Sequence, residues 1–168
     1  MSNYRRARVA GGCYFFTVVS HRRQPVLTDP TTRAALRKAI DATRLTHPFE
    51  IEAWVLLPEH LHCLWRLPVG DADYSLRWAQ IKRMTRHELG YAPTQALWQH
   101  RYWEHCIRDE NDYARHFDYI HWNPVKHGLV KCASEWPYST FHRSVKVGIY
   151  PADWGVAEND FEKGKFGE

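Results

Sequence analysis

The sequence predicts an α+β fold, a ferredoxin-like antiparallel sheet with its helices packed on one face. Short β-branched and aromatic runs alternate with longer stretches in which apolar residues recur at helical spacing. These segments follow one another as strand, helix, two strands, helix and strand, which is the ferredoxin-like order. The length of 168 residues suits one core. We therefore expect a single domain over residues 1–150 with a basic arm over 1–12, followed by an acidic tail over 151–168.

The first half of the chain supplies a central strand, a helix and a hairpin. Residues 13–20 are β-branched and aromatic at alternate positions of both parities, as in a strand covered on both faces. Residues 31–46 have helical apolar spacing, and residues 49–57 alternate apolar and polar side chains as a second strand. Pro58-Glu59 marks the turn to a third strand over residues 60–67.

The third strand has two chemically different faces. Side chains alternate across a strand, so residues of one parity share a face. The face that can bury against a helix holds Leu61, Cys63, Trp65 and Leu67. The other face holds His60, His62, Leu64 and Arg66. Two imidazoles are therefore expected side by side.

The second half of the chain completes the predicted order. Residues 75–89 are expected to form a helix that is basic on one side, and residues 97–107 a strand. Asp109 or Asn111 can cap a third helix. We expect this helix to end at about Trp122, because a residue before proline disfavours helical backbone.

The charge of the chain is unevenly distributed, although the formal net charge is only +4. Asp29 is the only acid among the first 38 residues, which contain Arg5, Arg6, Arg8, Arg22, Arg23, Arg33, Arg37 and Lys38. The tail is acidic. A basic front indicates a polyanionic partner, and aromatic residues among basic ones can stack on unpaired bases. A solvated charged surface is the alternative interpretation.

Several classes of protein are excluded. The four cysteines are widely spaced without a C-x-x-C pair, which argues against a disulfide framework and a four-cysteine zinc site. Reduced thiols are typical of the cytoplasm. No secretory signal is apparent, and no run approaches the roughly 18 apolar residues of a membrane span. We expect a cytoplasmic protein without membrane contact.

Two motifs carry the chemistry. His60 and His62, two residues apart on a strand, point the same way and can ligate one cation, although surface or structurally bonded histidines are the commoner case. Tyr119 and Asn123, four residues apart, project from the same side of a helix. A phenol with a pKa near ~10 needs a base or a cation to attack phosphorus. The alternative is a half-buried tyrosine and a helix-terminating asparagine.

Together these motifs resemble the HUH single-strand nucleases with one catalytic tyrosine, and within them the REP-associated tyrosine transposases, where REP denotes a repetitive extragenic palindrome. The matching segments extend nearly from end to end. They are residues 4–6, 11–17, 53–62, 98–108, 118–128 and 136–140. The runs Pro-Glu-His-Leu-His and Asn-Pro-Val-Lys-His-Gly are the most specific of them.

The resemblance implies a strand-transfer reaction on single-stranded DNA. His60, His62 and the amide oxygen of Asn123 would bind one divalent metal ion, Mg²⁺ or Mn²⁺, although two imidazoles favour softer ions than Mg²⁺. Tyr119 would attack the scissile phosphate and form a 5′-phosphotyrosine intermediate, leaving a free 3′-hydroxyl that can later rejoin strands.

The implied partner is a REP hairpin with a short tetranucleotide at its 5′ foot. Tyr4, Arg5, Arg6 and Arg8 in the arm would reach the tetranucleotide, and Lys82, Arg83 and Arg86 would hold hairpin phosphates. A bacterial, nucleoid-associated monomer is expected. A further hypothesis is that the residues after Trp154 lie over the basic DNA surface and damp activity, and a frayed chain end is the alternative.

Other functions remain open at this level. A non-catalytic hairpin-binding protein would keep the same fold. A metal-dependent hydrolase would use water and leave no protein–DNA adduct. A zinc-stabilised structural module lacks four ligands at the usual spacing.

Overall fold

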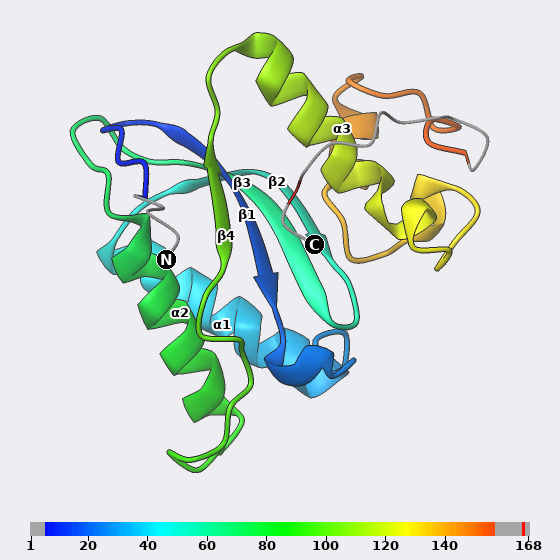
Figure 1. The fold of residues 1–168 in the computed structure, drawn as a ribbon. Coiled ribbons are helices and arrows are strands. Elements are labelled where there is room, and N and C mark those ends of the chain that lie inside the picture. Colours follow the sequence, from blue (N-terminus) through cyan, green and yellow to red (C-terminus); the bar gives the residue numbers. More distant parts are fainter. Residues whose placement is uncertain (1–5, 157–165, 167–168) are drawn as a thin grey trace, which may run out of the picture.

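The computed structural model describes residues 6–156 and residue 166. Its centre is a four-stranded antiparallel sheet in the order β2-β3-β1-β4 (Figure 1). The strands are β1 (Cys13–Val19), β2 (Glu50–Leu56), β3 (His60–Arg66) and β4 (Trp103–Cys106). Helix α1 (Pro30–Thr46) follows β1, and helix α2 (Tyr74–Glu88) follows β3. The α+β class and the ferredoxin-like order are therefore confirmed.

The two central strands, β1 and β3, determine where the conspicuous side chains lie. β1 is buried at all seven positions, as predicted for a strand covered on both faces. It pairs with β3 so that Thr17 lies opposite His62 and Val19 opposite His60. Leu57 donates its backbone N–H to the His60 carbonyl at 2.8 Å, which closes the β2–β3 hairpin. His60 therefore begins its strand directly after a tight turn.

Helices α1 and α2 cover one face of the sheet. They pack against each other and against the face that carries Leu61, Cys63 and Trp65. The rings of Trp65 and Trp78 stack with centroids 4.2 Å apart. The parity predicted for β3 is thus confirmed, because its apolar face meets these two helices.

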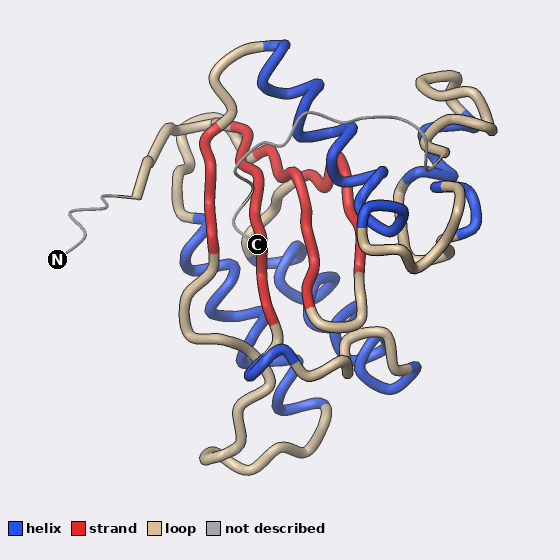
Figure 2. The backbone as a smooth tube through the Cα atoms, turned by 45° about the vertical axis from the view of Figure 1, so that its right-hand side comes forward, coloured by secondary structure: helices blue, strands red, loops and turns tan. Residues whose placement is uncertain are grey.

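The third long helix, α3 (Glu110–Lys126), lies on the opposite face of the sheet from α1 and α2 (Figure 2). The expectation that all helices pack on one face is wrong for α3. The side chains of Phe117 and Ile120 pack there with Phe15 and Leu64. A second apolar cluster therefore exists beneath α3, on the histidine-bearing face of β3.

Two predicted boundaries also differ from the structure. The helix does not end at Trp122 but continues through Pro124 to Lys126. Proline removes one backbone donor from the helix, and we infer that the burial of Asn123, Pro124 and Val125 offsets this cost. The last strand is four residues long, because Trp98 makes only an isolated bridge, to Ser20.

The remaining elements of the described chain are short helices, and the segment before the last of them pairs with β2. Short helices occur at η1 (His21–Arg23), η2 (Ala133–Glu135) and α4 (Phe141–Lys146). Tyr138 and Thr140 exchange backbone hydrogen bonds with Leu56 and Trp54, at 2.9 Å each. The segment before α4 therefore extends the sheet beyond β2. No helix in the described part of the chain has the length and apolar character of a membrane span.

Candidate active site

The His-x-His pair lies beneath α3. His60 and His62 are buried and project from the same face of β3, with ring centroids 4.9 Å apart and nearly perpendicular planes. β3 is held on both sides by β1 and β2. The two imidazoles therefore sit on a rigid strand, as a preorganised pair requires.

Tyr119 approaches the pair from α3. Its ring centroid lies 5.3 Å from that of His62, and only 5% of the residue is exposed. Asn123 lies one helical turn further on and is fully buried. The structure therefore brings together two motifs that are far apart in the sequence, as the sequence-based interpretation required.

The hydrogen bonds of Thr17 define the tautomer of His62. The Thr17 hydroxyl donates to the Phe166 carbonyl at 2.6 Å and lies 2.8 Å from His62 Nδ1. A hydroxyl has one proton, so Nδ1–H of His62 must donate to the Thr17 oxygen. The lone pair of His62 is then on Nε2, the form of imidazole that binds a metal. With a second imidazole and a buried amide, the donor set fits a divalent cation.

Lys126 is a site residue that the sequence analysis missed. Its Nζ donates to the Tyr119 hydroxyl at 2.8 Å and lies 4.9 Å from the ring centroid. A cation at this distance stabilises a phenolate relative to a phenol. Lys126 follows Tyr119 by two helical turns and contacts it only because the helix continues that far. Since the helix was predicted to end at Trp122, this contact was not predicted. His127, whose ring lies 5.0 Å from that of His60, was missed for the same reason.

Two basic residues one turn before Tyr119 on α3, Arg115 and His116, do not contribute to the site. Arg115 is exposed. His116 is buried, and burial lowers the pKa of its imidazole. Its Nδ1 lies 2.7 Å from the Asp112 carbonyl oxygen, within one helical turn. His116 therefore belongs to a separate polar network at the start of α3.

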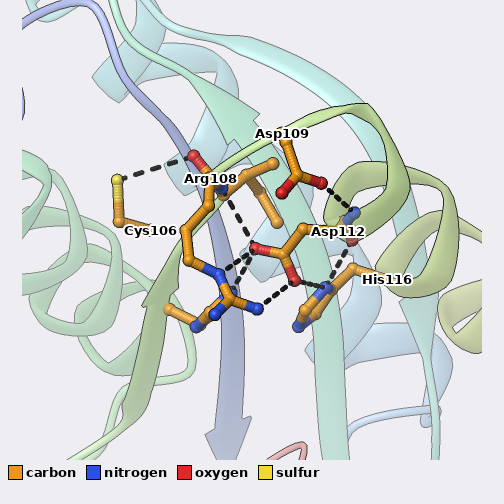
Figure 3. A network of polar contacts seen from close by, with 7 residues as sticks. Cys106, Arg108, Asp109, Asp112 and His116 are labelled. Carbon is orange, nitrogen blue, oxygen red and sulfur yellow. Dashed lines mark hydrogen bonds and ion pairs between the residues drawn. The ribbon is translucent and has the colours of Figure 1, made fainter.

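That network is centred on Asp112 and is drawn in Figure 3. Asp112 receives His105 Nε2 at 2.7 Å and Arg108 Nε at 3.1 Å, and His116 Nδ1 lies 3.4 Å from its carboxylate. Burial raises the pKa of Asp112, but the hydrogen bonds from Arg108 and His105 outweigh it and hold the pKa well below the ordinary value. The three side chains His105, Asp112 and His116 have ligand spacing. However, the guanidinium already neutralises the carboxylate, so the network anchors α3 to β4.

Two of the predicted DNA-binding residues, Arg6 and Lys82, meet at Tyr102. Arg6 stacks over its ring at 4.4 Å and donates to its hydroxyl at 2.6 Å, and Lys82 Nζ lies 5.2 Å from the same ring. Burial and the nearby Arg6 lower the pKa of Lys82 to about 8. Lys82 also donates to the Gln99 carbonyl at 2.8 Å. It is thus partly engaged within the protein.

The other predicted DNA-binding residues differ in availability. Arg8 and Arg83 are exposed, whereas Arg86 is half-buried and makes long contacts of 3.3 and 3.4 Å to the carbonyls of Pro93 and Ala92. Tyr4 and Arg5 lie outside the described residues. The described part of the arm, with Arg6 and Arg8, and the basic side of α2 therefore form one basic surface at the β4 edge of the sheet.

A histidine pair on a central strand that faces a tyrosine on a covering helix defines the class of HUH single-strand nucleases and transposases. The comparisons with known proteins narrow this class. A REP-associated tyrosine transposase of Escherichia coli K12 is 51% identical over 166 residues, covering 98% of each chain. A Haemophilus influenzae protein assigned to the same family is 45% identical over 167 residues, covering 92% of this chain and 94% of its own.

A solved structure of the same family matches this chain closely. The structure of a REP-associated tyrosine transposase bound to a REP hairpin superposes with a TM-score of 0.90 at 50% sequence identity, covering 100% of this chain and 98% of that one. No family model matches the chain. With half of its residues identical to a relative over nearly its full length, the chain belongs to the REP-associated tyrosine transposases.

Proposed function

We propose that this protein cleaves and rejoins single-stranded DNA beside a REP hairpin through a 5′-phosphotyrosine intermediate on Tyr119. The observation that carries the proposal is the 5.3 Å separation of the Tyr119 and His62 rings within one chain. The hairpin bound to the structural relative supports the substrate class. Because one chain supplies both motifs, we also propose that the monomer is active.

His60, His62 and Asn123 are the proposed ligands of a divalent metal ion, Mg²⁺ or Mn²⁺. A cation bound by these donors would polarise the scissile phosphate and stabilise charge on its oxygens. Thr17 orients His62 through its hydrogen bond to Nδ1. These roles follow from the donor types and from their common burial beneath α3.

The chain's own residues perform the transfer. The Tyr119 oxygen forms a bond to phosphorus while the bond from phosphorus to the 3′ oxygen breaks. The phenol loses its proton to solvent, and the departing 3′ oxygen gains one. Lys126, 2.8 Å from the attacking oxygen, favours the phenolate. The phosphoester is conserved in the adduct, so a 3′-hydroxyl can reverse the step without ATP.

The basic surface of the arm and α2 is the proposed hairpin site. Arg6, Arg8 and Arg83 offer cationic side chains at the β4 edge, and Tyr102 lies between the arm and α2. Lys82, whose amine already binds Gln99, would contribute charge without a direct phosphate contact. A chain lacking residues 1–8 should bind the hairpin more weakly, and unchanged affinity would remove the arm from this role. Work on chromosomal DNA would place the protein in the cytoplasm, at the nucleoid.

The test is incubation with a labelled REP-type hairpin carrying single-stranded flanks and Mn²⁺ or Mg²⁺, followed by a denaturing gel. A protein-linked band is expected with the wild type and none with Tyr119→Phe. Cleavage that survives Tyr119→Phe would indicate water as the nucleophile, as in a hydrolase. Hairpin binding without an adduct under either metal would favour a non-catalytic binding protein.

A further inference from the structure

A second basic surface lies at the opposite edge of the sheet from the arm. It is a groove of about 400 Å³ between α1, β2 and the segment that extends the sheet before α4. Four arginines line it against a single carboxylate, Asp41. They are Arg33, Arg37, Arg44 and Arg143. Because β2 and β4 are the two edges of the sheet, this groove is distinct from the hairpin surface proposed above.

The arginines of α1 form a stripe that faces the groove. Arg33, Arg37 and Arg44 occur at helical spacing and line the same wall. Arg37 is exposed and makes no ion pair or side-chain hydrogen bond to a described residue. An exposed, unpaired cationic side chain on the wall of a groove indicates an anionic ligand.

The other three arginines are held by hydrogen bonds to backbone carbonyls but keep unused N–H donors. Arg33 gives one hydrogen bond to the Thr28 carbonyl at 2.9 Å, and Arg44 gives one to the Phe49 carbonyl at 3.0 Å. Arg143 uses Nη2 for the carbonyls of Ile51 and Glu52. A guanidinium has five N–H donors, so each retains donors for a ligand. This arrangement is preorganised, since the charges are held without being neutralised.

Two aromatic side chains lie among these charges. Trp54 of β2 and Tyr138 of the added segment both line the groove and are half-buried. The Arg33 guanidinium lies 4.3 Å from the Tyr138 ring centroid. Arginines beside partly exposed rings bind phosphates and stack unpaired bases, as in sites for single-stranded nucleic acid. Duplex DNA would not present its bases to such a concave surface.

The groove is linked to α3 through one side chain of the segment before α4. Thr140 lines the groove, and its hydroxyl lies 2.8 Å from Nε2 of His121. His121 lies on α3 between Tyr119 and Asn123. The groove therefore borders the helix that carries Tyr119.

We propose that this groove binds a short single-stranded stretch of DNA at the same time as the hairpin. The phosphates lie on Arg37 and its neighbours, and a base stacks on Trp54 or Tyr138. The inference rests on the proposed function, because it assigns to the same reaction a place for the strand that flanks the hairpin. A transfer reaction needs such a place, since it must hold a second strand end while the first is attached to Tyr119.

The experiment measures a ternary complex in metal-free buffer at about 50 mM salt, where phosphate contacts are strong. The protein is first saturated with a REP-type hairpin that has no flanking strands. A labelled oligothymidylate of about ten nucleotides, a length typical of compact single-strand sites, is then titrated. The wild type should bind both. Arg37→Glu should weaken oligonucleotide binding about ten-fold and reduce its salt slope by about one or more.

Lys131→Glu is the matched control, because it makes the same charge change at an exposed residue outside the groove. It should bind the oligonucleotide as the wild type does. An oligonucleotide containing 5-iodouracil should photocrosslink to Trp54 or Tyr138. Displacement of the hairpin by the oligonucleotide, equal binding by Arg37→Glu, or competition by inorganic phosphate alone would overturn the proposal.

The two proposals fail in different ways. No adduct on Tyr119 in the gel experiment would defeat the proposed function and leave the ternary complex to be measured. Adduct formation together with loss of the ternary complex in the wild type would defeat only the groove.

Discussion

The two faces of the sheet are built on the same four strands and bury different kinds of side chain. On the face beneath α1 and α2, Trp65 and Trp78 stack within a large apolar cluster, and the charged side chains buried there, Arg77 and Glu104, are paired with Asp71 and Arg6. On the face beneath α3, the apolar cluster shares its space with His60, His62 and Asn123. Burying polar groups costs free energy unless they are well paired. We infer that the face beneath α1 and α2 contributes most of the free energy of folding. The face beneath α3 contributes less, because it buries the polar residues of the candidate site.

The largest effect should come from breaking the apolar face. Trp78→Ala removes a fully buried ring that stacks on Trp65 and should cost about 3–5 kcal/mol of unfolding free energy. Urea unfolding would measure it. Adduct formation per folded molecule should stay near the wild-type level, because Trp78 does not touch the α3 face. A comparable loss of adduct at full folding would show that the faces are not separate.

The next change affects the face beneath α3, which carries the candidate active site and is called the chemical face below. Lys126→Met removes the donor to the Tyr119 hydroxyl and should slow adduct formation on the order of 100-fold. The unfolding free energy should change by less than about 0.5 kcal/mol, because Lys126 is exposed. Lys126→Arg, which keeps a cation there, should restore part of the rate. Equal rates for Lys126→Met and the wild type would exclude the activating role.

The acid sensitivity of the fold should arise from the same face. Burial lowers the pKa of His121 from 6.5 to about 3, so the folded protein holds it neutral while the unfolded chain protonates it. Stability from this group is complete above pH 6.5 and falls as the pH drops towards 3, by up to about 1.4 kcal/mol per pH unit. Urea unfolding in metal-free buffer should show a loss of roughly 2 kcal/mol between pH 6.5 and 5.

His121→Gln is the control for this effect. The amide can still hydrogen-bond the Thr140 hydroxyl, which lies 2.8 Å from Nε2 in the wild type, but it does not titrate. The slope between pH 5 and 6.5 should therefore become shallower, with the remainder due to His116, whose pKa burial also lowers. An unchanged slope would place the acid-sensitive group elsewhere.

The smallest effect should come from Phe166, which covers the Tyr119 ring. The Phe166 ring stacks on the Tyr119 ring at 3.7 Å, whereas residues 157–165 of the tail lie outside the described residues. Such a stack is worth about 0.5–1.5 kcal/mol, so Phe166→Ala should raise adduct yield roughly 3- to 10-fold. This contact supports the proposal that the tail damps activity, and it gives Phe166 a place in that role at Tyr119. An unchanged yield for Phe166→Ala and for a chain ending at Trp154 would refute it.

Much of the fold was predictable from local patterns. The alternation along β3 correctly separated the Trp65 face from the His62 face, because strand geometry sends successive side chains to opposite sides. The turn at Pro58-Glu59 and the order of elements followed from equally local signals. The association of the His-x-His pair with Tyr119 came from the family resemblance, and the structure places the two rings 5.3 Å apart.

Other features depended on tertiary structure. An apolar helical stripe does not specify which face of a sheet it will cover, so the position of α3 opposite α1 and α2 could not be inferred from its sequence. The proline signal ended α3 too early because burial of Asn123, Pro124 and Val125 outweighs one lost hydrogen bond. Because the helix was predicted to end too early, the contact between Lys126 and Tyr119 was not predicted.

The sequence by itself therefore determined the strands, their faces and the residues able to do chemistry, since these depend on backbone periodicity and on side-chain type. Tertiary structure alone decided that Lys126 meets the Tyr119 hydroxyl, that Lys82 is partly engaged with Gln99, and that four arginines share one groove at the β2 edge. Each of these joins elements, or turns of a helix, whose contact depends on how the whole chain packs.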